Sequence, residues 1–280
     1  MGGCTLDPLP RSIKGSKLKA FDGNIESVQF QKLLSSGDNE QSSDGQVPHS
    51  QVFLVSIDGK QFALKIFNFF SIDEIRPFAF GRERVLDDNI VRHHLDPFYA
   101  ECRAFGLLVE KGRDDELAVR CHGYAFLSDT LEHQIERQFG IKGWNRQPED
   151  EGTQLRAIVK DYIKWTSLCH RRSFETMRKN IQELNALGIY NMDIREGNYL
   201  GGRLFDFSIA ITSPHLRLWT KFQPIDIILR DKKDDLRCFD SMVRGMETGV
   251  DRNGEPATAE EPVRRPVTRS QKSKALEAGI

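Results

Sequence analysis

The stretch YNMDIREGNYLGGRLFDFS, residues 190 to 208, restricts the possible folds more than any other part of the sequence. Asp193 and Asn198 stand in the pattern D-x₄-N, and Asp206 follows the pair Gly201-Gly202. Two adjacent glycines between apolar dipeptides predict a tight hairpin, because glycine adopts the positive φ angles that such turns need. The hairpin would fold the chain back and bring Asp206 toward Asn198. Three oxygen-bearing side chains are therefore expected to converge.

This convergence favours a site for a divalent cation and a phosphate. Mg²⁺ prefers hard oxygen ligands and shares them with substrate phosphates, so Asn198 and Asp206 are the candidate metal ligands. Asp193 would orient or deprotonate an attacking hydroxyl. Arg195 would offset charge on a transferring phosphoryl group. The alternative interpretation is a loop in which Asp and Asn side chains only cap turns through their own backbone.

Earlier segments predict a sheet with a helix beside it. Residues 52–57 and 61–67 alternate between apolar and polar side chains around an Asp58-Gly59 turn, which predicts a hairpin. Residues 97–111 are predicted to form a helix, because Pro97 suits the first turn and apolar residues recur at helical spacing.

Further elements follow along the chain. Residues 116–127 and 156–163 are predicted to be strands, separated by a helix and a polar loop. The pattern over 173–187 predicts a strong helix with Ser173 as its cap and Gly188 as its end.

Taken together, these segments resemble the motifs of protein kinases. FALKIF resembles the strand that carries the kinase lysine, FYAECRAFG the helix that supplies its glutamate, and AIVKDY the hinge strand. NMDIREGN is similar to the catalytic loop, and DFS to the metal-binding triplet. More closely, PFYAECRAFG, VRCHGY and MDIREGNYLGGRLFDFS resemble the fungal kinetochore family named for subunit Fta-two of the Sim-four complex. The resemblance covers about residues 21–220, and many members of that family are kinase-like domains of unknown function.

The resemblance implies an α+β, protein-kinase-like two-lobed fold with an abbreviated C-terminal lobe. The domain would span residues 21–246, with the N-terminal lobe over about 21–163 and the shortened C-terminal lobe over about 164–246. A last helix is expected within residues 234–246. Residues 1–20 are expected to be flexible. Residues 247–280 are expected to be disordered, because they are rich in Gly, Pro, Thr, Arg and Glu.

The resemblance also implies the ligands ATP and Mg²⁺ and a role for each candidate residue. Lys65 would contact the nucleotide phosphates and pair with Glu101, although each could also be an ordinary charged residue of its strand or helix. Asp193 would be the catalytic base, and Arg195 occupies the place of a lysine that reaches the terminal phosphate. The metal would be held by Asn198 and Asp206.

Several departures from the kinase pattern leave the activity open. Residues 33–53, which should cover the phosphates, contain no G-x-G-x-x-G. Asn191 stands where kinases have a histidine, which we expect to remove a structural anchor. Ser208 replaces the glycine of the metal-binding triplet, and the short chain after Asp206 has no A-P-E segment. Two functions therefore stand side by side: phosphoryl transfer to an unknown acceptor, or a pseudokinase scaffold at a kinetochore.

The charge and composition of the chain indicate which classes of partner to expect. A formal net charge of -1 provides no global attraction to nucleic acid, beyond weak contacts of the basic tail RRPVTRSQKSK. The sequence contains neither a membrane-spanning apolar run nor a secretory signal, so we expect a protein of the nucleus or cytoplasm that binds a nucleotide and a protein partner, and no membrane. The five cysteines form no CxxC pair, which excludes a zinc knuckle of that type, and His93-His94 is predicted to be a surface pair.

Overall fold

A computed structural model describes the chain over residues 14–35, 48–72, 87–164 and 171–248. These residues form a mixed α+β structure, so the predicted class is confirmed. The chain divides into two units, residues 1–240 and 241–280, and every contact discussed below lies within the first. Within the part of the chain that is described, no helix is both long and apolar enough to cross a membrane.

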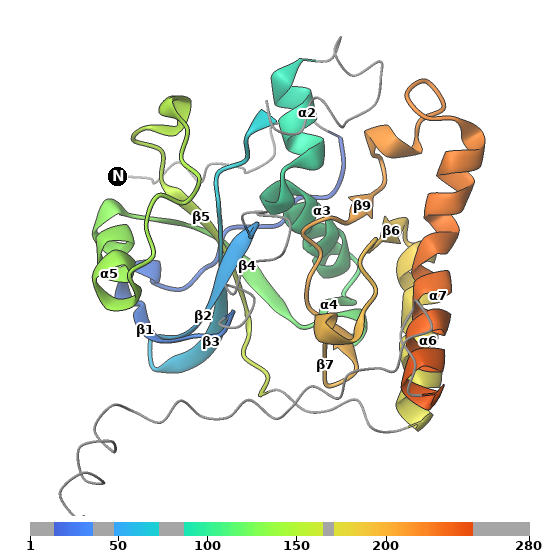
Figure 1. Cartoon of the computed structure of the whole chain (residues 1–280). Helices are drawn as coiled ribbons and strands as arrows, with labels where there is room; N and C mark the ends of the chain where they lie inside the picture. The colour runs from blue at the N-terminus through green and yellow to red at the C-terminus, as the bar shows by residue number, and fades with distance from the viewer. Residues whose placement is uncertain (1–13, 36–47, 73–86, 165–170, 249–280) are drawn as a thin grey trace, which may run out of the picture. The chain divides into compact units, whose positions relative to one another are not determined.

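Five antiparallel strands form the main sheet, in the spatial order β1-β2-β3-β5-β4 (Figure 1). Their bounds are β1 Gln29–Leu33, β2 Ser50–Ile57, β3 Lys60–Phe67, β4 Cys121–Leu127 and β5 Leu155–Asp161. The predicted hairpin of β2 and β3 is confirmed: Ile57 pairs with Lys60, and Asp58 and Gly59 both have positive φ angles. A two-residue turn of this kind matches the twist of the strands that it joins.

One face of the sheet carries a hydrophobic core. Leu64 and Ile66 of β3 pack there with Ala157 and Val159 of β5, and each is almost fully buried. Helix α5, Asp129–Phe139, follows β4 and contributes to this core, as does the buried Trp144 in the loop after it; the lining residues from this region are Leu131, Ile135 and Trp144, with Phe139 and Ile141 packed against them. Residues 131–152 therefore supply an apolar cover for the sheet, a role that the sequence left open.

Helix α3, Pro97–Glu110, lies against the other face of the sheet. Pro97 occupies the first turn as predicted, and the preceding Asp96 caps the helix by accepting a hydrogen bond from the Phe98 backbone N–H at 2.9 Å. Arg156 of β5 donates to the same buried carboxylate at 2.5 Å. The start of α3 is thus fixed to the sheet by a buried ion pair, because breaking one partner would leave an uncompensated charge.

The segment before β1 runs beside α3 and β4. Leu18 is buried, Ala20 forms a bridge with Tyr124, and the Phe21 N–H donates to the Tyr124 carbonyl at 2.8 Å. A Cβ atom at Gly106 would stand 2.6 Å from backbone atoms of Lys17 and Leu18. Glycine in α3 therefore permits this close approach.

Helix α2, Asp88–Leu95, precedes α3 and corrects one prediction. His93 and His94 are both buried, not a surface pair, because the C-terminal half of α2 packs into the structure and the His94 ring meets that of His215. Burial lowers the pKa of His94 to about 2 and that of His215 to about 3. Both imidazoles are therefore neutral near pH 7.

The remaining elements carry the candidate site and the segments around it. They are η1 Ile25–Ser27, α4 Asp114–Leu117, η3 Pro148–Asp150, α6 Arg171–Ala186, β6 Ile189–Tyr190, η4 Glu196–Asn198, β7 Tyr199–Leu200, β8 Arg203–Leu204, β9 Ile211–Thr212, η5 Leu216–Leu218 and α7 Ile225–Thr248. The strand predicted from residue 116 begins at Cys121, since α4 occupies its expected start. Helix α6 is confirmed, but it begins before Ser173, which is therefore no cap. Gly188 follows it with a φ of 84°.

Helix α7 is longer than the sequence pattern indicates. We expected a helix within residues 234–246, and α7 starts at Ile225. Its buried residues include Ile228, Asp231, Asp235 and Phe239. Two of these are aspartates, which hides the helical period from a reading based on apolar residues.

Candidate functional site

The predicted glycine hairpin is present and places Asp206. Gly201 and Gly202 have φ angles of 56° and 76°, and β7 pairs with β8 through Tyr199 and Leu204. The backbone of Leu204 is tied to the first half of the domain, because its carbonyl accepts from the Val119 N–H at 2.8 Å. The segment that leads into Asp206 is therefore fixed on both sides.

A buried aspartate of α7 holds the loop before Asp193. Asp235 is 1% exposed, and its two carboxylate oxygens accept from the backbone N–H groups of Asn191 at 2.7 Å and Met192 at 2.8 Å. Met192 has a φ of 67°, which is rare for a residue with a side chain and is maintained only where the surroundings enforce it. Burial raises the pKa of Asp235 to about 6, although both N–H donors favour the carboxylate. Sequence reasoning missed Asp235, since a lone acid in a charged helix has no distinctive pattern.

Asn191 links this loop to the segment Asp206-Phe207-Ser208. Its side-chain Nδ2 donates to the Asp206 backbone carbonyl at 2.6 Å, and its Oδ1 accepts from the Asp193 N–H at 3.1 Å. The expectation that losing the histidine removes a structural anchor is therefore wrong. An asparagine provides one donor and one acceptor at this position, which is enough to connect the two segments.

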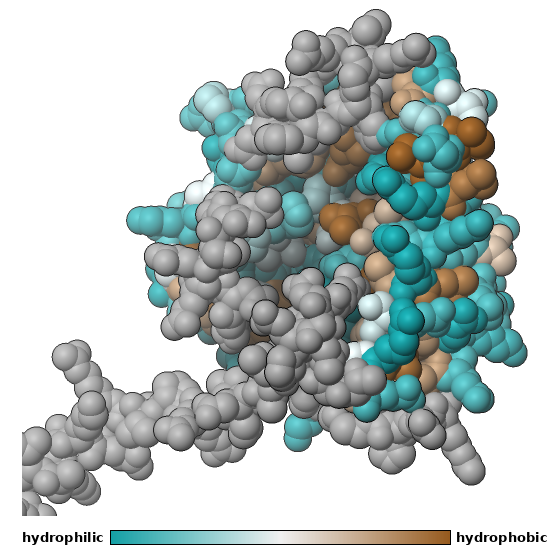
Figure 2. Space-filling model, turned by 45° about the vertical axis from the view of Figure 1, so that its right-hand side comes forward, coloured by the Kyte–Doolittle hydropathy of each residue, from teal (hydrophilic) through white to brown (hydrophobic). Residues whose placement is uncertain are grey.

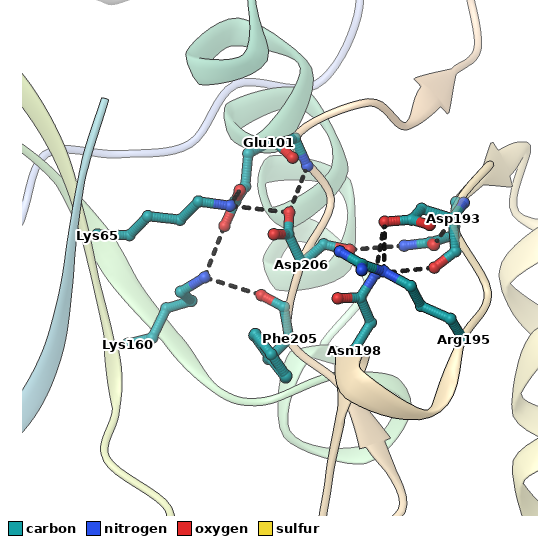
Figure 3. A network of polar contacts seen from close by, with 10 residues as sticks. Lys65, Glu101, Lys160, Asp193, Arg195, Asn198, Phe205 and Asp206 are labelled. Carbon is teal, nitrogen blue, oxygen red and sulfur yellow. Dashed lines mark hydrogen bonds and ion pairs between the residues drawn. The ribbon is translucent and has the colours of Figure 1, made fainter. Parts of the chain in front are cut away.

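Asp193 and Asn198 lie together, as their spacing predicts, and Arg195 joins them (Figure 3). Asn198 is buried, and its Nδ2 donates to the backbone carbonyl and to Oδ2 of Asp193, each at 2.8 Å. Arg195 is more exposed and donates from Nε to the same Oδ2 at 3.1 Å. These bonds orient the Asp193 carboxylate, whose side chain is 38% exposed.

Lys65 connects Glu101 with Asp206. Its ammonium group lies 2.7 Å from Glu101 Oε2 and 2.8 Å from Asp206 Oδ1. Lys65 and Glu101 are buried, and the Asp206 side chain is 26% exposed. The three residues come from β3, α3 and the segment after β8, so the contact joins the sheet, the helix and the loop in one place (Figure 3).

The charges in this network control each other's ionisation. Burial alone would lower the pKa of Lys65, but the carboxylates of Asp206 and Glu101 raise it above its ordinary value. Burial alone would raise the pKa of Asp206, but the charges of Lys65 and then Lys160, with a hydrogen bond from the Ser208 N–H, hold it well below its ordinary value. Asp206 is therefore ionised at neutral pH.

Lys160 of β5 belongs to the same network and was missed. Its ammonium group donates to Glu101 Oε1 at 2.7 Å and to the Phe205 carbonyl at 2.8 Å. Arg156 and Lys160 stand four positions apart on β5, and both reach α3, because residues at an even spacing share a face of a strand. The signal in the sequence is a cation directly after the apolar run AIV of the strand segment AIVKDY.

Most of the site residues lie in a part of the chain that matches a known family. The chain matches the family described as Kinetochore Sim4 complex subunit FTA2 over residues 6–211. It belongs to that family. No curated protein matches the chain. The part that matches the FTA2 family includes every site residue named above except Asp235 of α7.

Asp206 and Asn198 of this FTA2-family chain would each offer one side-chain oxygen to a cation such as Mg²⁺. Among the described residues, none donates a hydrogen bond to Oδ2 of Asp206 or to Oδ1 of Asn198. These residues also contain no group of three or more His, Cys, Asp or Glu side chains arranged to hold a metal. Two protein oxygens with remaining positions for phosphate and water are the usual provision for Mg²⁺. Residues 33–53 are the segment expected to cover the phosphates. Of these, residues 36–47 lie outside the described residues.

Proposed function

We propose that the chain binds ATP with Mg²⁺ and transfers a phosphoryl group to an acceptor still to be identified. The observation that carries this proposal is the single network that joins Lys65, Glu101 and Asp206, beside Asp193 and Asn198. These side chains come from distant parts of the sequence. A loop whose acids only cap local turns would have no reason to meet a buried lysine of β3.

The arrangement of the elements supports a protein-kinase-like two-lobed domain for this activity. The antiparallel sheet with α3 on one face would be the small lobe. The segments from α6 to α7 would be the shortened second lobe, with Asp235 as its internal support for the loop at Asp193. In such a domain the nucleotide would lie where the two lobes meet, beside Lys65 and Asp206.

Each residue would have a separate task. Asp206 and Asn198 would hold Mg²⁺, which when bound neutralises charge on the phosphate oxygens. Lys65 would move part of its contact from Asp206 to the phosphates, while Glu101 keeps it in place. The buried surroundings strengthen these interactions, since charges attract more strongly where water is excluded.

Asp193 would accept the proton of the attacking hydroxyl. One of its carboxylate oxygens is bound by Asn198 and Arg195, which leaves the other for the acceptor. Arg195 is 61% exposed, so it could turn from Asp193 to a transferring phosphoryl group.

The first test is calorimetry of ATP with and without Mg²⁺, on the wild type and on Asp206→Ala. We expect ATP to bind the wild type, and to bind it up to about tenfold more tightly with Mg²⁺ than without. Asp206→Ala should abolish this gain from Mg²⁺, whereas the exposed control Asp226→Ala keeps it. A wild type that binds no ATP would refute the proposal. Where binding is found, Asp193→Asn should abolish turnover without unfolding the protein, and unchanged turnover would contradict the role of Asp193.

The family match favours a second function, a structural subunit of a kinetochore complex. The description of the family names such a subunit, which implies protein partners and a nuclear location. A pure scaffold should keep its partners in Lys65→Ala and Asp206→Ala variants. Fluorescently tagged wild type and both variants would then all concentrate at kinetochores. If both folded variants lost that position together with ATP binding, the nucleotide site would be part of the assembly function.

A further inference from the structure

Lys160 adds a charge to the candidate site that the proposed reaction does not require. Its side chain is 4% exposed and contacts Glu101 Oε1, whereas Lys65 contacts Oε2, so each Glu101 oxygen has its own ammonium partner. Figure 3 shows the two lysines reaching the same carboxylate from neighbouring strands. Glu101 would therefore stay neutralised even if Lys65 left it.

Lys65, Glu101, Asp206 and Lys160 form a cluster whose net charge is zero only because Lys160 is present. Lys65 and Glu101 cancel, and Asp206 would leave one negative charge, which attracts a cation. Lys160 supplies the opposite charge, so two ammonium groups face two carboxylates. A buried group that carries no net charge gains less from a divalent ion than one that is negative.

The influence of Lys160 reaches Asp206 itself. Its ammonium group donates to the carbonyl of Phe205, the residue before Asp206, at 2.8 Å. A positive charge held so close to the Asp206 carboxylate opposes the binding of Mg²⁺ there, because the two cations repel each other. The same charge favours an anion placed beside Asp206.

We propose that Lys160 sets the divalent-cation requirement of the site: its ammonium group replaces part of the charge of a metal ion, so phosphate groups bind with only a weak dependence on Mg²⁺. This inference rests on the proposed function, since it concerns the same site. It assigns Lys160 an electrostatic role and names nucleotide polyphosphate as the ligand whose charge the site accommodates.

A purely structural role for Lys160 is the competing explanation. Its bonds to Glu101 and to the Phe205 carbonyl could serve only to hold α3 and the segment before Asp206. Two substitutions separate these roles. Lys160→Gln removes the charge but keeps an N–H donor, one bond shorter than the lysine, whereas Lys160→Met removes both the charge and the donor.

The test is titration of the full-length protein with Mn²⁺, followed by the relaxation of water protons. We expect Lys160→Gln to bind Mn²⁺ at least about tenfold more tightly than the wild type. Adding Asp206→Asn to Lys160→Gln should remove that gain, which would place the ion at Asp206. An equal Mn²⁺ affinity of Lys160→Gln and wild type, or no binding by either, would overturn the proposal. A change in Mn²⁺ affinity that appears in Lys160→Met but not in Lys160→Gln would also overturn it, because it would follow the loss of the N–H donor and not the loss of the charge.

Calorimetry with ATP separates this inference from the proposed function. We expect the wild type to bind metal-free ATP within about tenfold of its affinity for ATP with Mg²⁺, and Lys160→Gln to widen that ratio by about tenfold. If no variant binds ATP, the proposed function fails while the Mn²⁺ titration still decides the role of Lys160. A ratio that Lys160→Gln leaves unchanged would refute the electrostatic role even where ATP binds.

Discussion

The buried carboxylate of Asp235 offers the sharpest test of how the site loop is held. Asp235→Ala would leave the N–H groups of Asn191 and Met192 without their acceptor inside the protein. A buried donor without a partner costs about 1–3 kcal/mol, and two are affected. We therefore expect Asp235→Ala to lower the free energy of unfolding by about 3–5 kcal/mol. Asp235→Asn keeps an acceptor for one donor and should lose about half as much.

Urea unfolding followed by circular dichroism would measure both losses. The matched control is Asp234→Ala, the next residue on α7, whose side chain is 22% exposed and pairs with Arg237 on the surface. Its loss should stay below about 1 kcal/mol, because exposed ion pairs contribute little. Equal losses for Asp234→Ala and Asp235→Ala would refute the reasoning, since they would mean that the two hydrogen bonds to the loop add no stability.

Three further predictions concern other parts of the fold. The pKa values of His94 and His215 are lowered by burial to about 2 and about 3, so the unfolded chain binds protons more strongly below about pH 6.5. Their contribution to the free energy of unfolding is complete above that pH and should fall by about 2 kcal/mol per histidine from pH 6.5 to 5. Urea titrations at several pH values should show that His94→Gln loses less stability than the wild type over this range. An equal dependence of stability on pH in the two proteins would contradict this. Met192→Val should lower the free energy of unfolding by at least about 1 kcal/mol, because a β-branched side chain fits a positive φ poorly, while Met192→Gly should not lower it. Gly106→Ala should displace the backbone at Lys17 and Leu18 and speed tryptic cleavage there relative to Gly197→Ala, which has open space; equal rates would disprove the close contact.

The elements that the sequence predicts well are those with a local cause. The β2–β3 hairpin follows from Asp58-Gly59, and the turn before Asp206 follows from Gly201-Gly202, because glycine permits φ angles that other residues avoid. The meeting of Asp193 with Asn198 also follows from short spacing. Only the resemblance to kinases indicated that Lys65 and Glu101 belong to the same site, since no local pattern connects a strand with a helix so far along the chain.

What the sequence did not reveal depends on contacts between distant segments. Lys160 and Asp235 are single charged residues whose role arises only when β5 and α7 bring them to Glu101 and to the Asn191 backbone. The burial of His94 likewise depends on His215, which belongs to a segment after the site. Buried residues are predicted from the spacing of apolar side chains, so charged and polar residues of this kind are not recognised as buried. Their burial costs free energy, which specific partners must offset.

The departures from the kinase pattern differ in what they change. Asn191 replaces a histidine yet keeps the link between the loop at Asp193 and the backbone of Asp206. Lys160 is not one of these departures; it adds a cation to the pair of Lys65 and Glu101 without displacing either. Burying charged groups costs free energy that their partners must offset, and strongly shifted ionisation in a buried cluster is common at functional sites, so this arrangement is the reason for testing the proposed site first.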